Sequence, residues 1–296
     1  MMAAYQKPLT QYVSIANITF AYRRFGPPTG VPLVLMQHFR GTMDHWDPLL
    51  LSLLAIYRPL IIFDNAGIGA STGIIPATFA GWAADAIAFV SALGLTQIDL
   101  LGYSMSGAAA QMFALNAPHG MVRKLILAGT RASQSNRTVA GPPRPFAALF
   151  KAQTDEESEA ALAYSFYPET EEGRANAKAY WTRITEANNG VVPPFLSPEG
   201  GKAQAAAFVD WSTPNPDNSV ERLGELRMPV FVVNGDDDVL IPTVNSCELR
   251  EKIAGSQMMI YPKSGHGFLV QYAADFAEHV RLFLDGDAGR GEKAKL

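Results

Sequence analysis

The chain has 296 residues, of which 48% are hydrophobic and 18% charged, and its formal net charge at pH 7 is −4. That composition is typical of a folded globular protein and excludes a disordered one. The slight acidic excess leaves no basic surface for nucleic acid or for an anionic membrane, so we expect neither as a partner.

The first residues, MMAAYQKPLTQY, lack the basic and then apolar segments of a secretory signal. No stretch of the sequence reaches the ~18–20 consecutive apolar residues that span a bilayer. The single cysteine, Cys247, leaves no partner for an internal disulfide. These features predict a cytoplasmic protein, whose oligomeric state we expect to be monomer or homodimer.

Short apolar runs predict a sheet. Gln11–Ile15 and Ile18–Phe25 are rich in β-branched and aromatic residues and meet near Asn17, which is typical of a hairpin. Six further runs are continuously apolar, as buried parallel strands are. They are Leu33–Gln37, Leu60–Phe63, Ile98–Leu101, Leu125–Ala128, Val230–Val233 and Met258–Tyr261.

Helix-forming stretches separate several of these runs. They are Ala80–Leu93, Ser106–Asn116, Val244–Ile253 and Phe268–Phe283. Strands that alternate with helices predict βαβ units with right-handed crossovers. The sequence therefore predicts an α/β fold with a mostly parallel, eight-stranded sheet flanked by helices.

The alternation breaks at residues 131–227, which are rich in proline and aromatic residues and contain an acidic, helix-prone run at Asp155–Ala163. We interpret this stretch as a helical cap inserted into a core made of residues 1–130 and 228–284. Residues 285–296 are polar and glycine-rich, so we expect a flexible tail. Most aromatics of the cap are expected to pack it onto the core, and a few to line a pocket.

The segment GYSMSG at residues 102–107 follows an expected strand and opens an expected helix. A nucleophilic Ser104 on such a sharp turn is flanked two residues away by small side chains, which let strand and helix approach. Ser106 stands where glycine is usual, and Gly107 follows it. This segment resembles the nucleophile elbow of the α/β-hydrolase superfamily, especially the G-x-S-M-G form of small esterases and cofactor-free haloperoxidases.

The resemblance covers the expected core and implies the chain order serine, acid, histidine. The loop after Val230–Val233 looks like the family's G-x-x-D-x-x-x-P acid loop, which selects Asp238 over the adjacent Asp236 and Asp237. The segment SGHG after Met258–Tyr261 resembles the family's histidine loop and implies His266 as the base.

The implied oxyanion hole consists of backbone N–H groups. One is that of Met105, and the second comes from the loop after Leu33–Gln37, where Phe39 is favoured and Arg40 is the rival. His38 in this loop is expected to be structural. The turn DNAGIGAS at residues 64–71 resembles a structural turn of the family and lacks dinucleotide-binding spacing. We expect no cofactor and no metal.

The resemblance implies a serine hydrolase that cleaves a hydrophobic carboxylic ester or lactone through an acyl-enzyme, with water as co-substrate. Alternatives on the same fold are perhydrolase or haloperoxidase chemistry, C–C cleavage, polyketide tailoring, and a non-catalytic ligand receptor. Arg131 could anchor an acidic substrate group, although a solvated surface arginine is the more common case. The pocket is expected to include Arg40, Tyr103, Arg131, Trp181, Trp211, Leu240 and Phe268.

Overall fold

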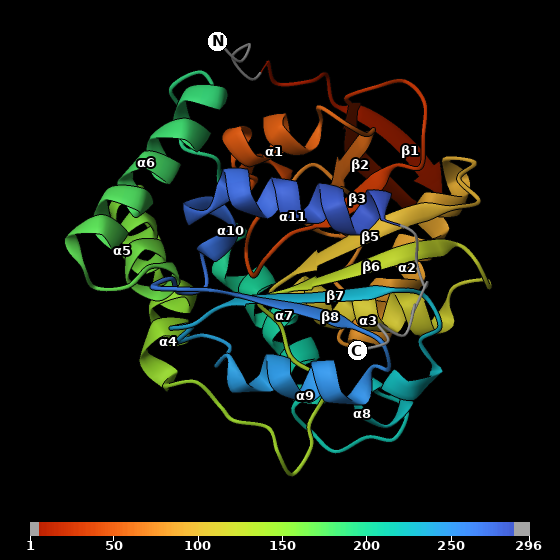
Figure 1. The fold of residues 1–296 in the computed structure, drawn as a ribbon. Coiled ribbons are helices and arrows are strands. Elements are labelled where there is room, and N and C mark those ends of the chain that lie inside the picture. The colour runs from red at the N-terminus through yellow and green to blue at the C-terminus, as the bar shows by residue number, and fades with distance from the viewer. Residues whose placement is uncertain (1–5, 287–296) are drawn as a thin grey trace.

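A computed structural model describes residues 6–286. The fold is built around one eight-stranded sheet, whose strand order is β1-β2-β4-β3-β5-β6-β7-β8 (Figure 1). The first hairpin is antiparallel, β2 pairs antiparallel with β4, and the other neighbours are parallel. This confirms the predicted mostly parallel sheet. The strands are β1 (Gln11–Ile15), β2 (Ile18–Phe25), β3 (Leu33–Met36), β4 (Leu60–Phe63), β5 (Ile98–Tyr103), β6 (Val122–Ala128), β7 (Val230–Gly235) and β8 (Gln257–Tyr261).

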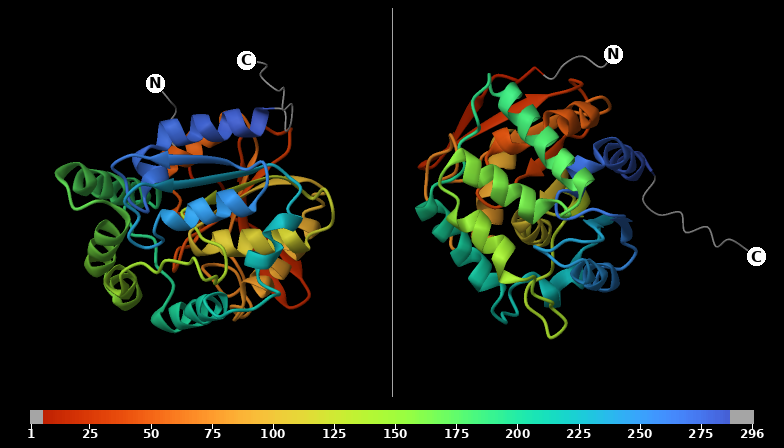
Figure 2. Two further views of the ribbon diagram at one scale, coloured as in Figure 1. Left: turned by 60° about the horizontal axis from the view of Figure 1, so that its bottom comes forward. Right: turned by 90° about the vertical axis from the view of Figure 1, so that its left-hand side faces the viewer.

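Helices cover both faces of the sheet (Figures 1 and 2). One face carries α1 (Pro48–Leu54), α10 (Phe268–Gln271) and α11 (Ala273–Asp285), and the other carries α2 (Phe79–Ala92), α3 (Met105–Asn116) and α9 (Val244–Lys252). A short 3-10 turn, η1 (Met43–His45), precedes α1. None of the helices within residues 6–286 combines the length and hydropathy that crossing a bilayer requires.

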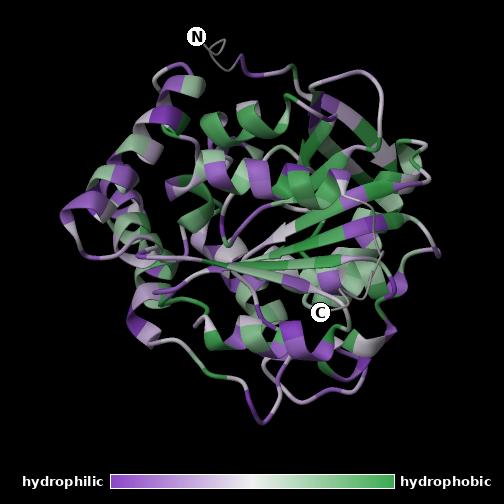
Figure 3. Cartoon of the chain, viewed as in Figure 1, coloured by the Kyte–Doolittle hydropathy of each residue, from purple (hydrophilic) through white to green (hydrophobic). Residues whose placement is uncertain are grey.

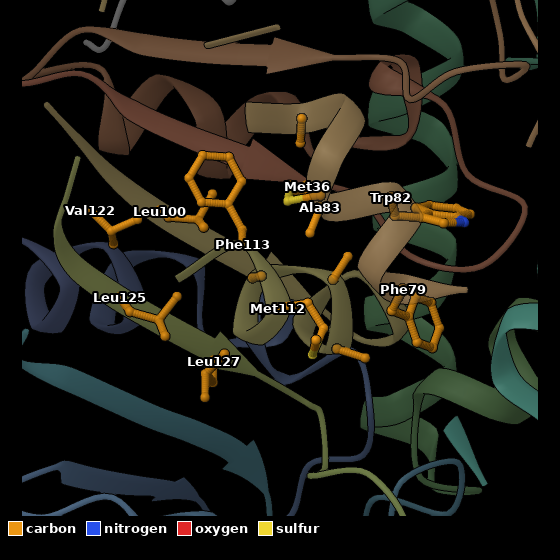
Figure 4. Close-up of a cluster of buried hydrophobic side chains, with 14 of the residues drawn as sticks. Met36, Phe79, Trp82, Ala83, Leu100, Met112, Phe113, Val122, Leu125 and Leu127 are labelled. Atoms are coloured by element: carbon orange, nitrogen blue, oxygen red, sulfur yellow. The ribbon is translucent and has the colours of Figure 1, made fainter. Parts of the chain in front are cut away.

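The central strands are apolar on both sides because each side of the sheet is covered (Figure 3). Figure 4 shows the cluster beneath α2 and α3, where Leu100, Leu125 and Leu127 of the strands lie near Phe113 and Met112 of α3. These buried contacts fix α3 against the sheet. The N-terminus of α3, which follows Ser104, is therefore set by packing along the whole helix.

The segment between β6 and β7 carries α4 (Pro143–Lys151), α5 (Asp155–Phe166), α6 (Glu171–Ala187) and α7 (Pro198–Trp211). Local signals start three of these helices, because the side chains of Thr154, Thr170 and Ser197 each accept a hydrogen bond from the first turn. The segment then adds α8 (Ser219–Arg222) and η2 (Leu223–Glu225), which pack on α3. We call α4–α7, with their connecting loops, the inserted helices.

The predicted flexible tail begins inside a helix, since α11 continues to Asp285. Asp285 Oδ1 accepts a hydrogen bond of 2.7 Å from Arg58 Nη2, which ties this end of α11 to the loop before β4. The remainder of the predicted tail, residues 287–296, lies outside the described residues.

Candidate active site

Ser104 occupies the turn between β5 and α3 in a backbone conformation that is unusual for a residue with a side chain. Its φ is 59° and its ψ −127°. Such a conformation costs on the order of 1–3 kcal/mol and persists where its surroundings enforce it. Here Ser104 N donates to Ala128 O at 2.8 Å, and Gly107 N donates to Ser104 O at 2.9 Å. Both bonds hold the turn, so the hydroxyl stands out from the carboxyl end of the sheet.

The small residues around the turn are required by close approach. A Cβ added to Gly102 would lie 2.5 Å from Ala110 Cβ, and one added to Gly107 would lie 2.5 Å from Thr130 Cβ. Ser106 is fully buried and donates its hydroxyl to Gln37 O, at the end of the neighbouring strand. The departure from the usual glycine therefore adds a hydrogen bond between α3 and the loop after β3.

Three side chains from the ends of different strands are joined by hydrogen bonds. Ser104 Oγ lies 2.8 Å from His266 Nε2, and His266 Nδ1 lies 2.7 Å from Asp238 Oδ2. An ionised carboxylate only accepts, so Nδ1 carries the proton and Nε2 accepts from the hydroxyl. All three side chains are buried, with exposures of 8% for Ser104, 5% for Asp238 and 0% for His266.

The acid loop separates Asp238 from its two neighbours. Asp238 Oδ1 accepts from the backbone N–H groups of Leu240 and Ile241 at 2.9 Å each, which leaves Oδ2 for His266. Asp236 and Asp237 are exposed, and Asp236 Oδ1 accepts from Ser264 N at 3.0 Å. Asp236 thus joins the acid and histidine loops, while Asp238 alone of the three contacts the imidazole.

The His266 loop is held by the elbow and by the inserted helices. The Tyr103 hydroxyl donates to His266 O at 2.8 Å, and the two rings stack at 5.2 Å. Gly267 N donates to Phe166 O at 2.7 Å, where α5 ends. A Cβ on Gly265 would lie 2.7 Å from the same carbonyl oxygen, so this contact requires glycine.

Two backbone N–H groups are available near Ser104. Within the described part of the chain, those of Met105 and Phe39 have no hydrogen-bond partner. Arg40 N, the rival to Phe39, donates to Gln204 Oε1 at 2.8 Å and is therefore occupied. This geometry favours Phe39 as the second donor to an oxyanion.

Arg40 has a different place from the one predicted. Its Nε donates to Leu196 O at 2.8 Å, and its Nη1 donates to Leu149 O at 2.7 Å and Ala152 O at 2.8 Å. The backbone of Arg40 adds a bond in which its carbonyl accepts from Leu196 N at 2.9 Å. Arg40 therefore joins the loop after β3 to the inserted helices and does not line the cavity described next.

A cavity of about 320 Å³ opens over Ser104 beneath α4 and α7. Of the predicted pocket and oxyanion residues, Phe39, Met105, Arg131 and Leu240 line it. Its wall also includes Phe146 and Leu149 of α4, Phe166 of α5, Phe208 of α7, and the loop at residues 138–143. The lining is mostly apolar, so an uncharged carbon skeleton fits its wall.

Four other predicted pocket residues are not among the lining residues, because packing inside the protein takes their side chains. Trp211 is fully buried against Phe79, with ring centroids 5.4 Å apart. Trp181 stacks on Phe195 at 6.3 Å, and Phe268 stacks on Tyr261 at 5.4 Å. Tyr103 lies below His266, as described above. The prediction that these side chains line the pocket is corrected accordingly.

Sequence reasoning missed the loop at residues 138–143, which closes one side of the cavity. The sequence signal for this loop is the proline pair Pro142-Pro143. The loop packs closely against the acid loop, because a Cβ added to Gly141 would lie 2.5 Å from Val239 O. Phe146 and Phe208 belong to the aromatic residues of the insertion, and nothing in the sequence distinguishes them from the others. Their helical position alone does not say which neighbour they meet.

Buried titratable groups surround the site without joining the hydrogen-bonded trio. Burial lowers the pKa of His38 to about 4 and that of His45 to about 3, so both are neutral at pH 7. Burial raises the pKa of Asp64 to about 6, although its carboxylate accepts from Met43 N and Ala70 N. Asp64 thus braces the turn that was expected to be structural. Among residues 6–286, no cluster of three or more His, Cys, Asp or Glu side chains is placed to hold a metal ion.

Comparison with known proteins gives a consistent result. A profile described as the alpha/beta hydrolase family matches residues 33–279. The poly(3-hydroxyalkanoate) depolymerase of Ectopseudomonas oleovorans is 27% identical over 90% of this chain and 89% of its own. The non-heme chloroperoxidase of Burkholderia pyrrocinia is 24% identical over 86% of this chain and 91% of its own.

Among solved structures, an alpha/beta hydrolase fold protein from Chitinophaga pinensis superposes with a TM-score of 0.85 at 31% identity, covering 96% of this chain and 100% of that one. The family match spans most of the sequence. The chain is a member of the alpha/beta hydrolase family and an enzyme of the hydrolase class.

Proposed function

We propose that this enzyme hydrolyses a hydrophobic carboxylic ester or lactone by a serine mechanism. The observation that carries the proposal is the buried chain of hydrogen bonds from Ser104 Oγ through His266 to Asp238, with distances of 2.8 and 2.7 Å. A neutral hydroxyl is a weak nucleophile, and an imidazole within hydrogen-bond distance is the group that activates it.

In the first half of the reaction, Ser104 Oγ attacks the acyl carbon while His266 Nε2 takes the hydroxyl proton. The imidazolium then gives that proton to the leaving alkoxide. Asp238 keeps the proton on Nδ1 and stabilises the positive ring. The two backbone N–H groups that hold Asp238 Oδ1 keep this carboxylate in place, so the imidazole needs no rearrangement during the proton transfers.

The tetrahedral oxyanion would be bound by the N–H groups of Met105 and Phe39. Each such donor contributes about 3–4 kcal/mol to transition-state stabilisation in comparable sites. Water then attacks the acyl-enzyme, with His266 as general base, and releases the acid. The inserted helices act as the cap, corresponding to the segment 131–227 expected from sequence, and their apolar wall selects the substrate.

Hydrolysis of polyesters by a relative is in line with an ester substrate, since the depolymerase named above shares most of its length with this chain. The chloroperoxidase relative supports one variation, in which hydrogen peroxide in place of water attacks the acyl-enzyme. Both reactions pass through the same acyl-Ser104. A single labelling experiment therefore tests the step that they share.

The test is the hydrolysis of p-nitrophenyl butyrate, together with labelling by a fluorophosphonate read by intact mass and peptide mapping. The wild type is expected to turn over the ester and to carry one label on Ser104, and Ser104→Ala to do neither. Ser91→Ala is the matched control, because Ser91 lies on α2 and its hydroxyl donates to the helical carbonyl of Ile87. A wild type that neither turns over nor is labelled overturns the proposal.

A further inference from the structure

Arg131 places a buried positive charge in the wall of the cavity over Ser104. It lies three residues beyond the end of β6, and its exposure is 8%. Among the described residues that line the cavity, it is the only charged one. Burial lowers the pKa of Arg131 to about 10, so the guanidinium is still protonated at pH 7.

This charge lacks a close anionic partner. Among the described residues, no carboxylate lies within 4.0 Å of the guanidinium, and Glu248 on α9 acts on it only through space. A buried charge without a paired counter-ion is costly for a folded protein. An anion that enters the cavity would relieve that cost, whereas an uncharged ligand would leave it in place.

The guanidinium is oriented in advance of any ligand. Its Nη1 donates to Ala132 O at 2.9 Å and its Nη2 to Ser212 Oγ at 2.7 Å, and the group lies 5.5 Å from the centre of the Phe208 ring. The backbone of Arg131 is fixed as well, because Gln111 Nε2 donates to its carbonyl at 3.0 Å. Gln111 belongs to α3, the helix that starts at the nucleophile, so Ser104 and Arg131 share one rigid support.

The remaining bonding capacity suits a carboxylate. Arginine has five N–H donors, and two of them are used within the described part of the chain. The planar fork binds a carboxylate through two parallel hydrogen bonds. Gln134, Thr138 and Ser212 place further polar side chains in the same cavity wall. The other lining residues offer mainly apolar contact.

The end of β6 brings this group close to the reacting centre. A Cβ added to Gly129 would lie 3.2 Å from His266 Cε1, and Arg131 follows two residues later. One small molecule in a cavity of about 320 Å³ can therefore reach both Ser104 and Arg131.

We propose that Arg131 forms a carboxylate subsite and that the substrate is an ester or lactone bearing a second, free carboxylate, joined to the scissile carbonyl by a short apolar chain. This rests on the proposed serine hydrolase function. The subsite would hold the free carboxylate on the guanidinium while the apolar wall holds the connecting chain.

The test compares two esters with acyl chains of equal length, mono-p-nitrophenyl adipate and p-nitrophenyl hexanoate. The wild type is expected to have the larger kcat/KM for the anionic ester, mainly through a lower KM. Arg131→Gln is expected to lower the anionic-to-neutral ratio of kcat/KM roughly 10- to 100-fold, as for the loss of charge-assisted hydrogen bonds. Arg131→Lys keeps the charge but not the planar fork, so its anionic-to-neutral ratio of kcat/KM is expected to lie between those of the wild type and Arg131→Gln.

A wild type that prefers the neutral ester overturns the proposal, whatever the fate of the variants. So does an Arg131→Gln variant that loses activity on both esters in the same proportion, because a purely structural arginine would act in that way. Folding of each variant is checked by its thermal midpoint. Ser212→Ala is the matched second variant, since it removes one contact of the guanidinium and keeps the charge; its ratio is expected to fall less than that of Arg131→Gln.

Failure of the proposed hydrolysis would be distinguishable from failure of the subsite. If the wild type cleaves neither ester, calorimetric titration of Ser104→Ala with monomethyl adipate and with dimethyl adipate still measures the charge preference. Binding of the monoanion at least about tenfold tighter than that of the neutral diester supports the subsite. Equal affinities overturn it.

Discussion

The strand-end loops and the inserted helices face each other across one cavity but are built differently. In the loops, Ser104, Asp238 and His266 have side-chain hydrogen bonds, and buried backbone bonds or glycine contacts fix each turn. The wall formed by the inserted helices consists of Phe146, Phe208 and other apolar side chains that meet by packing. Directional bonds set the chemistry, whereas shape alone sets most of the wall.

The difference implies a division of function between the two regions, in which the loops set the rate and the wall sets the preference among substrates. A change in the loops should alter the rate for every substrate by the same factor, because all substrates use the same proton transfers. A change in the wall should alter the ratio of kcat/KM between two substrates, because each acyl chain contacts a different part of the wall. Of four predictions, ordered from the largest expected effect to the smallest, those at Asp238 and Phe146 test this division, and those at His38 and Ser106 test how the loops are stabilised.

Asp238→Asn is expected to lower kcat about 10⁴-fold, because an amide at this position favours the wrong tautomer of His266. The division predicts the same factor for p-nitrophenyl butyrate and p-nitrophenyl decanoate. Steady-state kinetics on both esters check it. Asp237→Asn is the matched control, since Asp237 is exposed and adjacent, and its kcat is expected to stay within about twofold of wild type. Unequal factors for the two esters would contradict the division.

Within the loop after β3, the buried neutral His38 should make the free energy of unfolding depend on pH. Its pKa is about 4 in the folded protein, whereas the ordinary value for a histidine in water is 6.5, so the unfolded chain binds the proton first as the pH falls. The contribution of neutral His38 to the free energy of unfolding is fully present above pH 6.5 and is lost as the pH falls through 4. The full loss is about 3 kcal/mol. His45, with a pKa of about 3, acts in the same direction, and Asp64, with a pKa of about 6, in the opposite one.

Urea unfolding at pH 7.0, 5.5 and 4.5 isolates the contribution of His38. His38→Asn keeps a side-chain N–H for the carbonyl of Phe39 but cannot be protonated, so its stability should fall less steeply with pH than that of wild type. His119→Asn, at an exposed position, is the control and should keep the wild-type slope. Identical slopes for wild type and His38→Asn would refute the prediction.

In the wall, Phe146→Ala should change selectivity more than rate. The Phe146 ring lies 4.9 Å from that of Phe39 and 6.1 Å from that of Phe208, so its removal enlarges the cavity. We expect the decanoate-to-butyrate ratio of kcat/KM to rise about tenfold. Val209→Ala, at an exposed site on α7, should leave the ratio unchanged. A ratio that stays at the wild-type value in Phe146→Ala would show that the wall does not select by chain length.

The smallest effect is expected at Ser106, where the sequence departs from the usual glycine. Ser106→Gly removes the hydrogen bond to Gln37 O and weakens the first turn of α3. The free energy of unfolding should fall by about 1–2 kcal/mol. Ser106→Ala removes the same bond but introduces the residue with the highest helix propensity, so the difference between the two variants measures the cost of glycine relative to alanine. Urea unfolding checks both, and an unaltered stability in both would contradict the prediction.

Much of the core could be predicted because each signal there is local. The hairpin, the strand Leu60–Phe63 and the extents of α2, α3 and α9 follow from apolar runs and periodicity, and the structure places them within a few residues. Helix α1 was missed, although Asp47 followed by Pro48 is a readable start signal and Asp47 Oδ1 does accept from Leu49 N.

The wall of the cavity could not be predicted in the same way. Phe208 and Trp211 lie three residues apart on α7, yet one lines the cavity and the other is fully buried against Phe79. Periodicity places both on the same face of the helix but does not say which element contacts each side chain. That depends on how α7 docks onto α2, a contact between segments more than a hundred residues apart.

Arg40 limits how these two regions can be exchanged. Its guanidinium and backbone form hydrogen bonds with Leu149, Ala152, Leu196 and Gln204. Arg40 directly follows Phe39, so these bonds also position the Phe39 N–H. A chimaera that grafts a foreign insertion onto this sheet would leave those bonds without partners and displace the loop. The transplantable unit is therefore the insertion together with residues 38–41, and specificity can be recombined between relatives only when both pieces move together.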